Sequence, residues 1–177
     1  MVLSVFPFLL PAEFESACRD LADRCTSAQS AGGWFIRLVT QEALVRTGLN
    51  PKLQVDYDIV LSPTYQVPVL YFALRWHHYD GPVGLDAVYR YVVPEQYQRE
   101  LKSVGIMGGI SFGYHPESGS PAFFVHPCNT ADAMAQVTDA RSATAGTYLL
   151  IWLGLVGHCV NLHISRELVT SDSAGLS

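Results

Sequence analysis

The chain has 177 residues, of which 49% are apolar and 15% are charged. This composition is typical of a folded domain and excludes disorder along most of the chain. The formal charge is −5 and no window gathers the 11 basic residues into a stripe, which excludes a nucleic-acid-binding surface.

We expect one domain over residues 1–177, with flexible ends at about 1–9 and 168–177. The opening MVLSVFPFLLP has no basic start and contains two prolines, which argues against a signal peptide. The most apolar run, 148–160, is interrupted by two glycines and a histidine and is shorter than the roughly 20 residues that span a bilayer. The sequence therefore predicts a soluble, cytoplasmic protein.

A helix over residues 11–28 begins the predicted order of elements. Apolar residues recur there with the 3.6-residue period of a helix, and charged residues occupy the other positions. The apolar positions are Phe14, Cys18, Leu21, Ala22 and Cys25. Because proline is tolerated in the first turn of a helix, the helix is expected to begin at or just after Pro11.

Three segments rich in β-branched and aromatic residues then predict strands at 34–39, 53–62 and 66–76. The sequence Ser62-Pro63-Thr64-Tyr65 predicts a tight turn with an exposed tip between the last two. Pro68 cannot donate a hydrogen bond to a neighbouring strand, so its strand is expected to be bulged or at a sheet edge, where its backbone would be open to a partner protein.

The second half of the chain predicts shorter elements. These are a helix at 85–92, loop and extended chain at 105–119, a strand at 121–126, helices at 131–137 and 147–155, and a strand or extended segment at 159–164. The whole pattern indicates an α+β fold in which helices pack on an antiparallel β-sheet.

The four cysteines are Cys18, Cys25, Cys128 and Cys159. They are far apart in a chain without an export signal, so reduced thiols are expected. Cys18, Cys25 and Cys159 have apolar neighbours and are predicted to be packing residues. The close histidine and cysteine pairs lack the spacing of a zinc site, and no metal is predicted.

The stretch FFVHPCNT, residues 123–130, places Cys128 between a predicted strand and a predicted helix. The first N–H groups of that helix would face the sulfur and favour its reactive thiolate form. Pro127 restricts the backbone before the cysteine, and Asn129 or Thr130 can cap the helix. The residues leave two interpretations open for Cys128, a nucleophile or a buried structural thiol. His126 is likewise a candidate base or a residue that caps the backbone locally.

Three stretches together resemble the autophagy E2-like, ubiquitin-like-conjugating enzyme family. They are SPTYQVPVLYF at 62–72, FFVHPCNT at 123–130 and YLLIWLGLVGHCVNLHI at 148–164, and the similarity covers roughly residues 10–165.

This resemblance implies an E2-like core and an enzyme of autophagosome formation. Cys128 would accept the ubiquitin-like autophagy-related protein 12 as a thioester from the E1 enzyme, autophagy-related protein 7. It would then transfer the modifier to a lysine of autophagy-related protein 5, with no metal or organic cofactor.

One departure from the wider E2 pattern leaves the oxyanion donor unassigned. Ubiquitin E2 enzymes carry a His-Pro-Asn triplet upstream of the cysteine, and no asparagine of this chain lies at such a place. The candidate supporting residues are His126, Asn129, Tyr57, Tyr65 and His77.

Two other functions compete with this interpretation. A cysteine hydrolase needs an imidazole within hydrogen-bond reach of the sulfur, for which His115, His158 and His163 are further candidates. An E2-like enzyme for a lipid acceptor would also carry His-Pro-Cys, but that family has a large acidic insertion and a membrane-sensing N-terminal helix. This sequence has no such insertion, and its predicted opening helix has a charged outer face without a basic bias. An E2-like adaptor without catalysis would lack the cysteine.

Overall fold

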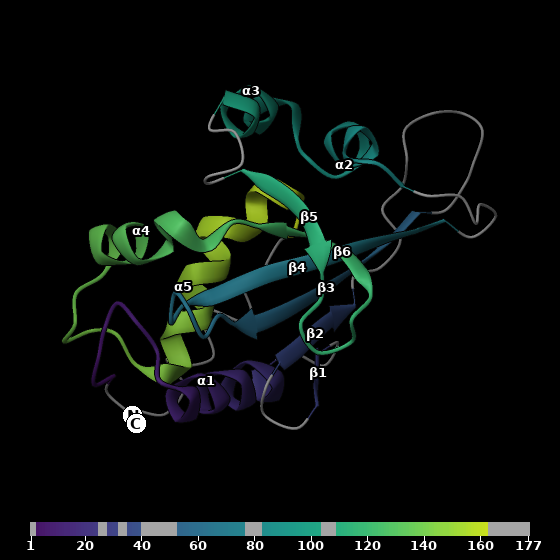
Figure 1. Ribbon diagram of the computed structural model, residues 1–177. Coiled ribbons are helices and arrows are strands. Elements are labelled where there is room, and N and C mark those ends of the chain that lie inside the picture. The colour runs from purple at the N-terminus through teal and green to yellow at the C-terminus, as the bar shows by residue number, and fades with distance from the viewer. Residues whose placement is uncertain are drawn as a thin grey trace.

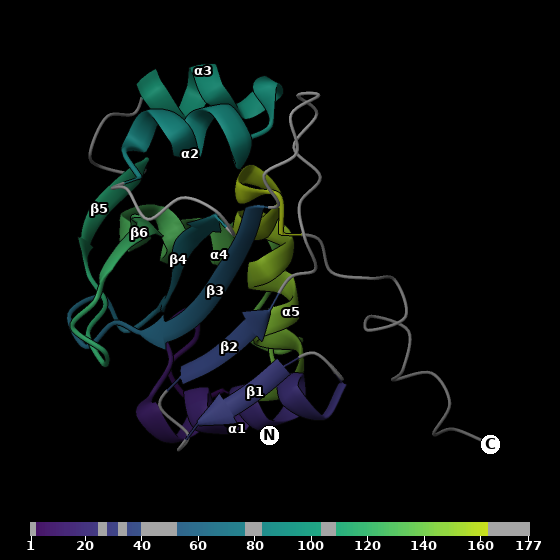
Figure 2. The same ribbon diagram turned by 90° about the vertical axis from the view of Figure 1, so that its right-hand side faces the viewer.

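Six antiparallel strands form one sheet in the order β1-β2-β3-β4-β6-β5, with β1 and β5 at its edges (Figures 1 and 2). The computed structural model describes residues 3–24, 28–31, 35–39, 53–76, 83–103 and 109–162. The strands are β1 (Ala28–Ala31), β2 (Phe35–Val39), β3 (Leu53–Leu61), β4 (Pro68–Trp76), β5 (Ile110–Tyr114) and β6 (Pro121–Val125). The fold is therefore α+β, as the sequence predicts.

Five α-helices and two short 3₁₀ turns accompany the sheet within these ranges. They are α1 (Pro11–Arg24), α2 (Leu85–Tyr91), α3 (Glu95–Ser103), α4 (Thr130–Val137), α5 (Ala145–Val156), η1 (Pro127–Asn129) and η2 (Gly157–Val160). Helices α1 and α5 pack on each other and on one face of the sheet, while α2 and α3 lie at one end of the molecule (Figure 2). None of the helices in the described part of the chain is long and apolar enough to cross a membrane.

Strands β3 and β4 divide their side chains between the two faces of the sheet. Tyr57 and Phe72 are paired across the strands and face the core, where the Tyr57 hydroxyl donates a 2.6 Å hydrogen bond to the Val160 carbonyl. Because neighbouring residues of a strand point to opposite faces, Asp56 and Asp58 lie on the other face. The core is thus confined to the face that α1 and α5 cover.

Helix α5 buries one side along its length, which agrees with the predicted apolar helix at 147–155. Its N-terminus has a capping box in which the side chains of Thr144 and Thr147 bond reciprocally to backbone N–H groups. Tyr148 and Trp152 are among the largest fully buried side chains of the described residues. This helix supplies much of the apolar surface against which the sheet folds.

The predicted end of the first helix is wrong. Helix α1 begins at Pro11, as expected, and Cys18 is fully buried, but the helix ends at Arg24. Ala28 is already in β1 and pairs with Leu38 of β2, so pairing with the next strand of the chain overrides the helical pattern. Cys25 lies outside the described residues.

The expectation for Pro68 is also wrong. Pro68 is the first residue of β4 and pairs with Leu61, while β4 itself is an interior strand between β3 and β6. Proline is tolerated there because β6 pairs with β4 only at Tyr71 and Phe72. The missing N–H of Pro68 therefore costs no hydrogen bond between these strands.

The predicted strand at 159–164 is wrong for its first two residues, which belong to η2. The turn closes through a hydrogen bond from the Leu162 N–H to the Gly157 carbonyl, and Asn161 adopts a left-handed φ of 60°. Helix α3 was not predicted, and β5 lies in the segment expected to be loop and extended chain.

The segment before α1, predicted to be flexible, is packed from residue 3 onward. Leu3 and Leu9 are buried, and the Glu13 carboxylate accepts hydrogen bonds from the Ser4 and Leu10 N–H groups at 2.6 and 2.9 Å. The Leu9 N–H donates to the Gln66 carbonyl at 2.8 Å. This N-terminal segment, residues 3–10, therefore anchors the turn between β3 and β4. The predicted flexible end at 168–177 lies outside the described residues.

Candidate active site

Cys128 lies in η1, between the end of β6 and the start of α4. Pro127 occupies the first position of this turn, where its fixed φ and missing N–H are compatible with a helix. The turn is closed by the Thr130 N–H, which donates to the Pro127 carbonyl. Pro127 is buried and Cys128 is half-buried, so the thiol is held on a packed support and still reaches the surface.

His126 acts as the cap of this turn. Its Nδ1 accepts a hydrogen bond from the Cys128 N–H at 3.3 Å, and its own N–H donates to the Gly109 carbonyl at 3.0 Å. An Nδ1 that accepts a hydrogen bond carries no proton, so the neutral ring is protonated on Nε2. The structure therefore gives His126 the capping role that the sequence left open beside a catalytic one.

Asn129 is the side chain that the sulfur contacts. The Cys128 thiol donates to Asn129 Oδ1, with a Sγ to Oδ1 distance of 3.6 Å. Asn129 is exposed and occupies the N-cap position of α4, but its side chain makes no capping hydrogen bond to the helix. The predicted cap is absent, and the amide is directed to the thiol.

The turn between β3 and β4 lies beside this site. Tyr65, at its exposed tip, places its ring edge-on to His126 with the ring centroids 5.7 Å apart. The ring of Phe124 in β6 is a second neighbour of this imidazole, with the ring centroids 6.3 Å apart. No sequence signal links residue 65 to residue 126, because the contact arises only when β6 follows β4 in the sheet.

The other candidate supporting residues lie elsewhere. Burial, with a smaller contribution from Cys159, raises the pKa of Tyr57, whose hydroxyl donates to a core carbonyl. His158 bonds through Nδ1 to the Gly154 carbonyl at 2.8 Å, and its ring is tilted against that of Tyr97 of α3, with the ring centroids 4.9 Å apart. His77 and His163 lie outside the described residues.

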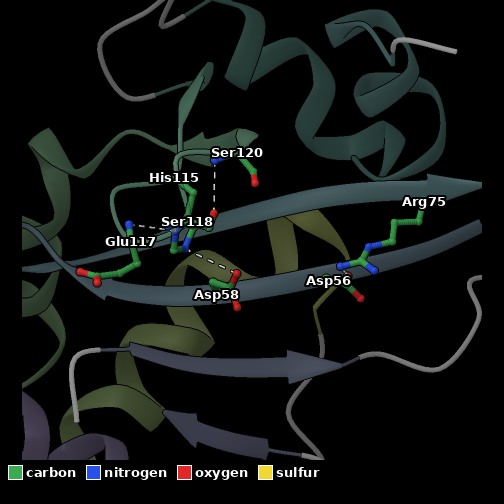
Figure 3. A network of polar contacts seen from close by, with 7 residues as sticks. All are labelled: Asp56, Asp58, Arg75, His115, Glu117, Ser118 and Ser120. Atoms are coloured by element: carbon green, nitrogen blue, oxygen red, sulfur yellow. Dashed lines mark hydrogen bonds and ion pairs between the residues drawn. The ribbon is translucent and has the colours of Figure 1, made fainter. Parts of the chain in front are cut away.

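His115 belongs to a separate polar cluster on the outer face of the sheet (Figure 3). Its Nδ1 accepts hydrogen bonds from the Glu117 and Ser118 N–H groups at 3.2 and 3.3 Å, and its Nε2 lies 3.5 Å from Asp58 Oδ2. His115 precedes β6 and His126 follows β6, so the length of this strand separates the two histidines.

The same cluster lines a pocket of about 270 Å³. Besides His115 and Asp58, it contains Asp56, which is paired with Arg75 at 2.6 Å. No group of three or more metal-binding side chains is present in the part of the chain that the structure describes.

Within that part of the chain, no imidazole forms a hydrogen bond with the sulfur of Cys128. The geometry that a cysteine hydrolase requires is therefore not found there. Burial, with a smaller contribution from Glu15, raises the pKa of the Cys18 thiol to about 12, so Cys18 is a packing residue, as predicted.

Comparison with known families agrees with the resemblance seen in the sequence. The family described as "Autophagocytosis associated protein, active-site domain" matches residues 36–167, a range that includes Cys128.

Curated relatives share the name ubiquitin-like-conjugating enzyme ATG10. The protein from Gibberella zeae is 44% identical over 72% of this chain and 54% of its own length. The protein from Arabidopsis thaliana is 32% identical over 74% of this chain and 59% of its own length. The human protein is 32% identical over 75% of this chain and 60% of its own length. The matches thus span little more than half of these relatives.

A solved structure supports the fold. The crystal structure of the autophagic E2 Atg10 matches 88% of this chain and 99% of its own, with a TM-score of 0.57 and 14% sequence identity. At that identity the likeness establishes the E2-like arrangement of strands and helices.

Proposed function

Because this chain belongs to the family of autophagocytosis-associated active-site domains, we propose that it is an E2-like enzyme that carries a ubiquitin-like modifier on Cys128. The modifier is autophagy-related protein 12, received from the E1 enzyme autophagy-related protein 7. The acceptor is a lysine of autophagy-related protein 5. The enzyme acts in the cytoplasm in autophagosome formation and needs no metal or organic cofactor.

The observation that carries this proposal is the environment of the thiol. Cys128 is half-exposed on a rigid turn, and the partner of its sulfur among the described residues is an amide, not an imidazole. A cysteine thiolate needs no dedicated base to attack a reactive thioester, because cysteine is already partly ionised near neutral pH. Because no imidazole of the described residues is bonded to the sulfur, we expect transfer to be favoured over hydrolysis.

The chemistry consists of two exchanges at one carbonyl carbon. In the first, Sγ attacks the thioester carried by the E1, a new C–S bond forms and the E1 thiolate leaves. In the second, the unprotonated lysine amine attacks, the C–S bond breaks and Cys128 leaves as a thiolate, while the surplus proton of the amine passes to solvent. The enzyme mainly supplies proximity and stabilises the oxyanion.

For the second step we propose Asn129 as the assisting side chain. Its amide contacts the sulfur, to which the modifier's carbonyl carbon becomes bonded. Rotation of the amide presents Nδ2, a hydrogen-bond donor, to the oxyanion. Asn129 would thus serve the purpose of the asparagine that ubiquitin E2 enzymes carry upstream of the cysteine.

A thioester assay tests the proposal. With E1, modifier and ATP, the wild-type protein should form an adduct that thiol reductant cleaves, and Cys128→Ser should form an oxyester that resists it. Cys128→Ala should form none, whereas Cys159→Ala should form the thioester normally. An adduct of equal yield on Cys128→Ala would disprove the assignment.

A further inference from the structure

In the η1 turn and its C-cap, the N–H groups of Cys128 and Thr130 have acceptors of different kinds. Pro127 has no N–H, and the Thr130 N–H is bonded to the backbone carbonyl of Pro127. The Cys128 N–H is bonded instead to a side chain, the imidazole of His126. A side-chain acceptor can leave by a small rotation, whereas a backbone acceptor leaves only if the turn unwinds.

This hydrogen bond is also a weak one. Its N to Nδ1 distance of 3.3 Å lies beyond the usual range for N–H donors. The donor belongs to the same residue as the sulfur, so it is close to the carbonyl of any acyl group attached there. An oxyanion donor needs this placement, near the atom where negative charge develops and fixed before the reaction begins.

We propose that the backbone N–H of Cys128 is an oxyanion donor of the transfer reaction, and that His126 is the positioning residue that holds this N–H until the thioester carbonyl takes it. This inference rests on the thioester chemistry proposed above. As the amine attacks, the π electron pair of the carbonyl moves to its oxygen, which accepts the N–H that His126 Nδ1 releases. When the C–S bond breaks, the carbonyl re-forms on the new amide and the N–H returns to Nδ1.

The surroundings of His126 fit this role. Its backbone donates a hydrogen bond to Gly109, and its ring has the rings of Tyr65 and Phe124 as neighbours. Among the residues that the structure describes, no carboxylate forms an ion pair with this ring, so a small reorientation suffices to release Nδ1. The Asn129 amide and the Cys128 N–H are then two donors of different kind, one from a side chain and one from the backbone.

Nuclear magnetic resonance of the protein alone tests the exchange of hydrogen-bond partners. In the unmodified protein, the amide proton shift of Cys128 should follow the protonation of His126, because protonation removes the Nδ1 acceptor. Cys128 is then acylated with the N-acetylglycine ester of a small thiol, in a background where Cys25 and Cys159 are alanine. After acylation, the amide proton shift of Cys128 should no longer change with the protonation of His126.

The chain contains a matched internal control for this measurement. The Glu117 and Ser118 N–H groups are bonded to His115 Nδ1 in the same manner, far along β6 from Cys128. Their shifts should be unchanged by acylation. A Cys128 amide that follows His126 equally before and after acylation would overturn the proposal.

Transfer of the same acyl group to free lysine tests whether the positioning of this N–H affects the rate of aminolysis. His126→Leu removes the acceptor and should slow aminolysis by about tenfold or more, toward the effect of losing an oxyanion donor. His126→Asn keeps an acceptor that can bond the N–H two residues later and should retain most of the rate. Alkylation by iodoacetamide forms no oxyanion, so its rate should be the same in all three proteins.

Because the acyl group is supplied chemically, the result does not depend on whether the protein partners are those proposed. A wild-type rate of aminolysis for His126→Leu, or equal slowing in His126→Leu and His126→Asn, would overturn the positioning role. Slowing of alkylation by the same factor would also overturn it, because the defect would then lie in the thiol itself.

Discussion

Two turns of this molecule, one at each end of β6, are capped by histidines in the same way, yet their surroundings differ. His115 caps the turn before the strand and is 4% exposed, with Asp58 next to its ring. His126 caps the turn after the strand and is half-buried, with an exposed tyrosine from another turn against it. Burial and a charged neighbour surround the first cap, whereas the second has aromatic neighbours and more contact with solvent, so we expect the second to reorient more easily.

The largest effect on stability is expected at the buried cap. His115→Ala should lower the free energy of unfolding by about 2–4 kcal/mol, because it removes a buried ring, takes the acceptor from two backbone N–H groups and leaves Asp58 without the imidazole. His126→Ala should cost about 1 kcal/mol or less, because its ring reaches solvent. Urea unfolding of the two variants measures the difference, and equal losses would contradict this distinction between the caps.

Asn129 is expected to have the next largest effect, on transfer instead of stability. Asn129→Ala should slow discharge of the Cys128 thioester to lysine by about tenfold, the loss of a donor near the oxyanion. Its melting temperature should change little, because the side chain makes no capping hydrogen bond. Single-turnover discharge checks this, and Asn129→Asp provides a variant of the same shape that has no amide donor.

Tyr65 tests whether the neighbouring turn supports the active-site cap. Tyr65→Ala should slow discharge severalfold, because His126 loses the ring that confines it. Tyr65→Phe keeps the edge-on ring and should behave as the wild type in discharge to free lysine. If both variants lose the same activity, the hydroxyl is the functional group and the packing explanation is wrong.

Glu13 tests the anchor of that turn through its dependence on pH. Burial by itself raises the pKa of Glu13, but hydrogen bonds from Leu10 and Ser4 together lower it below its ordinary value of 4.5. Since the folded-state pKa is the lower one, Glu13 stabilises the fold at pH values above 4.5, and this contribution is lost as the pH falls through the folded-state pKa.

Glu13→Gln should therefore be less stable than the wild type by about 1 kcal/mol at neutral pH, with a smaller difference in acid. Unfolding at a series of pH values measures it. A difference that stays constant from neutral pH to pH 3, which is about 1.5 units below the ordinary value, would exclude the carboxylate as its source.

The smallest effect is expected at Cys159. It is half-buried in η2, and its thiol donates to the carbonyl of Val156, the last residue of α5, at 2.8 Å. Cys159→Ala should leave thioester formation intact and cost about 1 kcal/mol of stability. Failure of the folded variant to form the thioester would mean that a second cysteine takes part in the chemistry.

The hydrogen bonds of the turn between β3 and β4 argue against the expectation that its backbone is open to a partner strand. The Gln66 carbonyl accepts from Leu9, and the Ser62 and Gln66 N–H groups are bonded across the turn. The exposure predicted for the tip is confirmed, since Tyr65 is 41% exposed. What the tip presents is therefore a side chain, placed against His126.

Several features followed from the sequence because they depend on neighbours along the chain. The amphipathic period starting at Pro11, the turn at Ser62-Pro63 and the apolar run of α5 each specify local structure through steric and hydrophobic patterns. The placement of Cys128 between a strand and a helix followed in the same way, as did the resemblance to a family that the comparisons confirm.

Only the tertiary structure decided which residues surround the thiol. Strand β6 lies next to β4, and this brings Tyr65 to His126 across 61 residues of sequence. The same pairing made β4 an interior strand despite Pro68. The caps likewise depend on where a side chain points: Asn129 faces the sulfur instead of its helix, and His126 accepts the Cys128 N–H. Sequence patterns report local preferences, whereas these contacts are set by packing between segments that are distant along the chain.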